Sequence, residues 1–137
     1  MTTAIRDTQP VVDSMLARVR PLGLSAFDGS APVTPMVRYV ALFEEIGPIP
    51  LERLSGDGAS FPWTGRAVVC AGTREGLRDA VALVRGAYRM WRPLGFPAST
   101  PLVEIQTGPV LTDGPAEDVR HSQTLVYRTT LTLFETV

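Results

Sequence analysis

Residues 73–91 constrain the fold most, because they form an amphipathic pattern that needs a surface to pack against. Their large apolar residues recur at steps of three and four, which is typical of one face of a helix. Thr73 can cap this helix through its hydroxyl, and Pro93 cannot continue the hydrogen-bond ladder. The apolar face comprises Leu77, Ala80, Val81, Val84, Tyr88 and Trp91. We predict a helix over residues 73–91 that buries this face.

A second helix is predicted near the N-terminus, beginning at Thr8 or Gln9. Pro10 suits its first turn, where a missing amide costs little. Pro21 and Gly23 are expected to end it. Its apolar stripe comprises Val11, Val12, Met15, Leu16 and Val19.

Four segments alternate with the period of strands. They are residues 36–44, 63–71, 102–111 and 122–136. In the third segment, Val103 and Ile105 are expected opposite Glu104 and Gln106, and Gly108-Pro109 should bend the strand. Turn-forming residues dominate 24–35 and 112–119, and the second of these loops is short enough for an antiparallel hairpin.

These elements predict an α+β layered domain with an antiparallel or mixed sheet of about four main strands. Both helices should pack on one face of the sheet. The length of 137 residues is enough for a sizeable core, and we expect a single domain over residues 1–137.

Charge and hydropathy limit the function classes. The net charge of −1 indicates neither a nucleic-acid-binding patch nor an acidic tail. The N-terminus lacks the apolar run of a signal peptide, and no segment is apolar enough to cross a bilayer. We therefore expect a chain without a membrane partner, either in the cytosol or in an assembly made there.

Candidate reactive groups are few. His121 is the only histidine, and Cys70, the only cysteine, falls within an apolar strand and is interpreted as a buried, inert thiol. Glu44 and Glu45 are neighbours on a strand, so their side chains should point to opposite faces and are poorly placed to share a proton or a metal. We predict no catalytic residues, no cofactor and no metal, and favour an interaction protein over an enzyme.

The long connection 46–62 is the main candidate contact segment. It carries Ile49, Leu51 and Leu54, which a solvated linker would not need. Loops of this length are usually functional or disordered. These side chains either fold back on the core or order against a neighbouring subunit, and the sequence favours neither.

Taken together, the chain resembles the tail terminator proteins of long-tailed bacteriophages and their gene-transfer-agent and prophage relatives. The resemblance covers nearly the whole chain and rests on spacing and small residues. The segments that carry it are the helix ending at residues 20–23, the turn residues Asp28, Gly29 and Pro32 before strand 36–42, strand 63–72 leading into helix 73–77, and the final strand 121–133.

This resemblance implies a hexameric ring at the head-proximal end of the tail tube, in a virion assembled in the host cytoplasm. The ring would stop tube polymerisation and dock on the head connector or stopper protein. DNA would pass through its lumen without sequence-specific binding. We predict that Leu51, Arg53 and Leu54 contact a tail-tube subunit or a neighbouring terminator. The full predicted interface set is Ile49, Leu51, Arg53, Leu54, Asp113, Glu117 and Asp118.

Two other classes remain open. One is another head–tail joining protein or a tail-tube subunit, which would also assemble into rings. The other is a small ligand-binding or enzymatic α+β domain with a pocket under loop 46–62. A defined oligomer favours the virion classes, and a monomer at high concentration favours the ligand-binding class.

Overall fold

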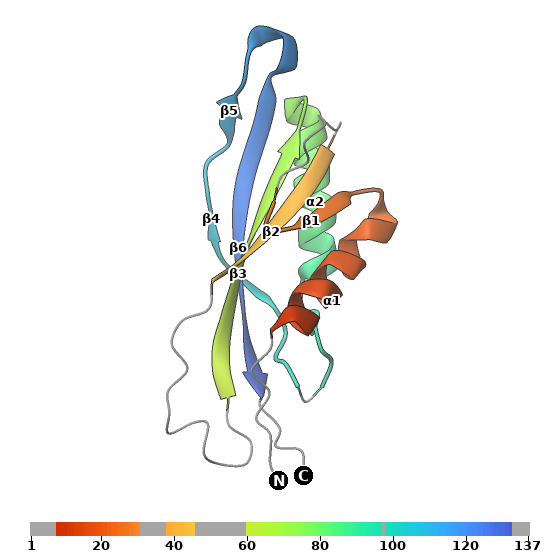
Figure 1. Cartoon of the computed structure of the whole chain (residues 1–137), viewed down its shortest axis with the longest axis vertical. Helices are drawn as coiled ribbons and strands as arrows, with labels where there is room; N and C mark the ends of the chain where they lie inside the picture. Colours follow the sequence, from red (N-terminus) through yellow and green to blue (C-terminus); the bar gives the residue numbers. More distant parts are fainter. Residues whose placement is uncertain (1–7, 31–37, 46–59, 97, 133–137) are drawn as a thin grey trace.

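The computed structural model describes residues 8–30, 38–45, 60–96 and 98–132. Within them, two α-helices pack on one face of a mixed six-stranded sheet, an α+β arrangement (Figure 1). The strand order is β1-β2-β3-β6-β4, and β5 also pairs with β6. The predicted fold class is confirmed, whereas the predicted count of about four strands is too low.

Helix α1 spans Gln9–Val19, with the proline in its first turn as expected. Its five predicted apolar residues are all buried. The chain leaves the helix through a 3₁₀ turn, Arg20–Leu22, and Gly23 adopts φ 81°. That conformation favours glycine and ends the segment, as the sequence predicts.

Helix α2 spans Arg74–Tyr88, and the Thr73 hydroxyl caps it by accepting a 3.0 Å hydrogen bond from the Gly76 amide. The predicted helix was too long at its C-terminus. Met90 adopts φ 56° and turns the chain three residues before Pro93. Trp91 therefore lies outside the helix, but its ring still packs on the core and stacks on Tyr88 at 6.0 Å.

The long strands β3 (Ser60–Ala71) and β6 (Arg120–Thr132) pair antiparallel and form the centre of the sheet. Strand β2 (Arg38–Glu45) is antiparallel to β3. Strand β1 (Ser25–Asp28) lies parallel to β2, in a segment that the sequence predicted to be only turns. The predicted turn at Asp28-Gly29 is present, with Gly29 at φ 65°.

The predicted strand 102–111 is two strands, β4 (Val103–Thr107) and β5 (Leu111–Asp113), both antiparallel to β6. The break falls at Gly108-Pro109, where a bend was expected, but β5 extends into the predicted loop. A bulge between Glu104 and Gln106 shifts the register. Val103 and Gln106 therefore share a face, so the predicted alternation along this strand is wrong.

The core lies between the sheet and the two helices. The helix-facing positions of β2, β3 and β6 alternate with outward-facing ones, as the pairing register shows. Trp63 is fully buried on the helix side, and its indole nitrogen donates a 2.7 Å hydrogen bond to Glu44. Buried Tyr88 donates a 2.8 Å hydrogen bond to the Met15 carbonyl and so joins the two helices.

Candidate assembly interface

Exposed apolar side chains gather along the β4–β5 edge of the sheet. Val103 is 55 % exposed and Leu111 is 58 % exposed, and Ile105 and Val110 are exposed as well. Strand β4 ends the strand order, and no described residue pairs with its outer edge. A free edge with apolar side chains is typical of a surface that contacts another chain.

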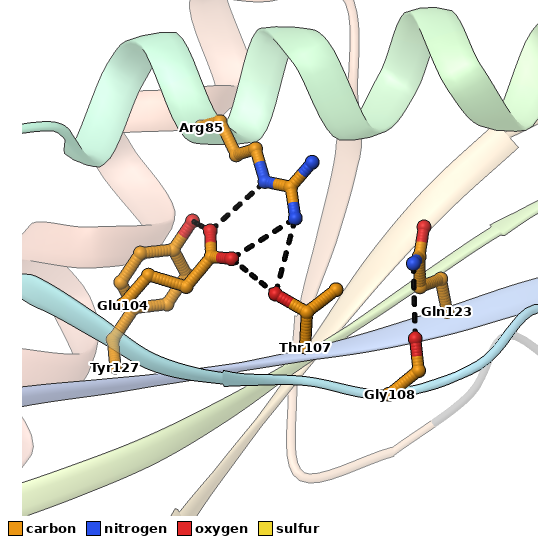
Figure 2. Close-up of polar contacts among 6 residues, drawn as sticks. All are labelled: Arg85, Glu104, Thr107, Gly108, Gln123 and Tyr127. Atoms are coloured by element: carbon orange, nitrogen blue, oxygen red, sulfur yellow. Dashed lines mark hydrogen bonds and ion pairs between the residues drawn. The ribbon is translucent and has the colours of Figure 1, made fainter.

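A polar cluster fixes β4 to α2 (Figure 2). The Arg85 guanidinium donates through Nε and Nη2 to the two carboxylate oxygens of Glu104, both at 2.9 Å. Nη2 also donates to the Thr107 hydroxyl at 3.1 Å, and that hydroxyl donates to Glu104. A bidentate pair of this kind holds its two elements in one orientation.

The cluster shifts the ionisation of its members. Hydrogen bonding from Arg85 lowers the pKa of Glu104, and the same contact raises the pKa of Arg85. Tyr127 of β6 reaches Glu104 through its hydroxyl at 3.4 Å. Burial raises the pKa of Tyr127, whose ring meets Tyr88 edge-on at 5.2 Å. The cluster thus connects the exposed edge with the core.

A groove of about 460 Å³ lies between α2 and β4, next to this cluster. Its lip carries Met90, which is 69 % exposed, and the exposed Arg89. Its apolar wall includes Leu102 and Val103. The full lining is Arg85, Gly86, Arg89, Met90, Leu102, Val103, Glu104 and Tyr127.

Beyond the groove, β5 and the start of β6 form a two-stranded arm, residues 109–122. The arm extends past the ends of the helices (Figure 1). Asp113 accepts a 2.7 Å hydrogen bond from the Gly114 amide, and Gly114 adopts φ 98° at the tip. Asp118 forms a 3.2 Å ion pair with Arg120. At the base, Gln123 donates to the Gly108 carbonyl at 2.9 Å (Figure 2).

The predicted interface residues divide between two places. Asp113 and Asp118 lie on the arm; Glu117 lies in the 3₁₀ turn Ala116–Asp118, and its side chain is outside the described part. The other four predicted interface residues belong to the connection 46–59, which is outside the described residues. They are Ile49, Leu51, Arg53 and Leu54.

The sequence prediction missed the groove and the apolar edge. Val103 and Ile105 were assigned to a strand without a judgement on their exposure. Arg85, which lies outside the predicted apolar face of the helix, makes an ion pair within the chain. The available signal was Glu104, the one charged residue of segment 102–111, because a carboxylate among apolar neighbours needs a partner.

The remaining polar candidates have structural partners. Burial raises the pKa of the Cys70 thiol, and a hydrogen bond with that thiol raises the pKa of Tyr39 to about 12. The Nδ1 atom of His121 lies 3.0 Å from the Thr112 hydroxyl. Glu45 pairs with Arg66 at 2.7 Å on the outer face, whereas Glu44 faces the helices.

Two further findings concern the described part of the chain. No group of three or more histidine, cysteine, aspartate or glutamate side chains there is placed to hold a metal ion. None of its helices combines the length and the apolar character needed to span a membrane.

The comparisons with known proteins find similarity at the level of structure. No protein-family model matches the chain, and no curated protein matches its sequence. A chain of the solved structure titled "Virion of native gene transfer agent (GTA) particle" is similar with a TM-score of 0.56 and 16 % identity. The match covers 89 % of this chain and 91 % of that one. The two chains therefore share a fold over nearly their whole lengths.

Proposed function

We propose that this chain is a structural virion protein of a bacteriophage or gene transfer agent, and that it acts as a tail terminator. Its copies form a ring, expected to be a hexamer, at the head-proximal end of the tail tube. The ring stops tube polymerisation and joins the tail to the connector or stopper protein. DNA passes through the ring, and the role is structural rather than catalytic.

One observation carries this proposal. A chain in a gene-transfer-agent virion has the same fold over 91 % of its length, so little of either chain is left for a different architecture. The sequence resemblance to tail terminators points to the same class of particle. Fold alone does not fix function. The proposed position at the head-proximal end of the tail therefore rests on the sequence resemblance to tail terminators.

The exposed β4–β5 edge supports a role in assembly. Monomeric proteins usually cover or charge their sheet edges. Here Val103, Ile105, Val110 and Leu111 are all exposed on one edge. A closed ring of identical subunits would bury such an edge by head-to-tail contacts between different patches of each copy.

The experiment is a tube-capping assay. The purified chain is added to the tail-tube protein encoded with it, and tube length and tube ends are examined by negative-stain microscopy. A terminator gives capped tubes of limited length and does not stack by itself. Filaments formed by this chain alone would instead identify it as a tube subunit, and unchanged tubes would contradict the proposal.

A triple substitution tests the predicted tube contact. Replacing Leu51, Arg53 and Leu54 with serine should leave a folded protein that no longer caps tubes. Ala17→Ser, at an exposed position of α1, is the control and should cap normally. Normal capping by the triple variant would show that Leu51, Arg53 and Leu54 are not needed for the tube contact.

A further inference from the structure

The arm, residues 109–122, has an exposed surface for which its own subunit provides no cover. Val110 and Leu111 are 46 % and 58 % exposed. Asp113 is exposed at the tip, and no ion pair is found for it among the described residues. The arm therefore presents apolar side chains followed by a negative charge.

The groove between α2 and β4 offers the opposite pattern. Its lining includes the apolar Met90 and the exposed Arg89. No described carboxylate pairs with Arg89. Arg85, by contrast, is already held by Glu104, which keeps the groove wall in place without using the charge of Arg89.

The arm cannot fill the groove of its own subunit. Val103 in the groove pairs with Arg128 of β6, whereas Leu111 pairs with Ser122. Six residues of an extended strand separate these positions, which corresponds to about 20 Å. The arm runs away from the C-terminal end of α2 (Figure 1). Only another molecule can place an arm there.

We propose that the arm of one copy docks in the groove of the next copy, with Leu111 against the apolar wall and Asp113 near Arg89. This inference rests on the proposed function only in taking copies of this chain as the partner. The arm and the groove are different patches, so the contact is head-to-tail and can close into a ring. Charge complementarity fixes the direction of the contact.

Simple strand addition fits the edge less well. The bulge between Glu104 and Gln106 interrupts the regular spacing of the outer edge of β4. Bulges of this kind protect edges from pairing with another strand. The exposed side chain of Met90 lines the groove, so the contact uses side chains in the groove rather than a continued ladder.

A mixing experiment tests the arm and the groove separately. Leu111→Asp disables the arm, and Met90→Asp disables the groove. Each variant alone should sediment as a monomer at concentrations where the wild-type chain forms rings. An equimolar mixture should give a heterodimer and nothing larger, because it contains only one intact arm–groove pair. Rings from either variant, or a mixture that stays monomeric, would overturn the docking.

A charge exchange tests the predicted neighbours. Arg89→Glu and Asp113→Arg should each raise the dissociation constant of the assembly at least 10-fold, and the double variant should return it to within about 3-fold of wild type. Arg78→Glu, at an exposed position of α2 outside the groove, is the control and should change little. A double variant as weak as the single ones would contradict the pairing.

These results are separable from those of the tube-capping assay. A wild-type chain that caps tubes but shows no self-association retains the proposed function and loses the arm–groove contact. Rings that form through the arm and the groove but fail to cap tubes would support the arm–groove contact and contradict the tail-terminator function.

Discussion

The packing of Trp63 against Gly65 gives a prediction that the structure specifies closely. Gly65 lies two residues after Trp63 on the same face of β3, and the indole covers it. A Cβ atom added at Gly65 would lie 2.4 Å from Cη2 of the indole and 2.9 Å from Cζ3. Both distances are below van der Waals contact, so the ring or the strand must move in Gly65→Ala.

The ring has little freedom to move. Trp63 is fully buried, and its indole nitrogen is held by Glu44 at 2.7 Å. Overpacking of a well-packed core costs about 1–3 kcal/mol. A displaced indole would also weaken a hydrogen bond to a carboxylate, a class worth about 1.5–3 kcal/mol. We expect Gly65→Ala to lower the free energy of unfolding by about 1–3 kcal/mol, since the two costs are alternative ways of relaxing the same clash and do not add.

Urea unfolding followed by far-UV circular dichroism measures this change. All variants must be compared at one protein concentration, because assembly would also stabilise the fold. Gly72→Ala is the matched control, since its added Cβ meets nothing within 4 Å. The control should be neutral or stabilised by up to about 1 kcal/mol.

The source of the cost is tested in a second background. Trp63→Phe removes the indole atoms that approach Gly65, so Gly65→Ala should cost much less there than in the wild-type chain. An equal cost in both backgrounds would show that the clash is not with the indole. A wild-type stability for Gly65→Ala would refute the packing argument as a whole.

Three further predictions concern single contacts. Thr73→Ala removes the cap of α2 and should cost about 1 kcal/mol in urea unfolding, whereas Thr73→Ser should cost little. Tyr88→Phe removes the buried hydrogen bond to the Met15 carbonyl and should cost about 0.5–1.5 kcal/mol in the same assay. Because Arg85 lowers the pKa of Glu104, the pair stabilises the fold above the unfolded pKa of Glu104 and loses this effect as the pH falls through the lower, folded pKa. Glu104→Gln should therefore flatten the pH dependence of stability below pH ~4.5, by less than about 1 kcal/mol because the pair is partly exposed, and an unchanged profile would contradict the ion pair.

The helices were predictable because their signals are local. Both apolar stripes follow the 3.6-residue period, and caps such as Thr73 and Gly23 mark their ends. Strand β1 was not predictable in this way. It has only four residues, and what makes it a strand is its parallel pairing with β2, ten or more positions along the chain. Composition alone made the same residues look like turns.

The candidate interface was predictable only in part. The turn residues of the arm drew attention to Asp113 and Asp118 through their sequence. The groove, however, is made by the early end of α2 at Tyr88 and by the bulge in β4. Neither feature has a sequence period, and the ion pair that positions the groove joins residues nineteen positions apart.

The edge strand β4 combines two properties that act against each other. Its exposed Val103 and Ile105 favour contact with other chains, and its bulge and inward-facing Glu104 oppose unlimited strand pairing. Exposed apolar side chains on this edge give no advantage to a monomer. The bulge and Glu104 would hinder the continuous strand pairing of an open fibre. A closed assembly uses both, because each edge is covered once by a defined partner. This is the physical reason to look for a ring of fixed size rather than a filament, and sedimentation that grows without limit with concentration would count against it.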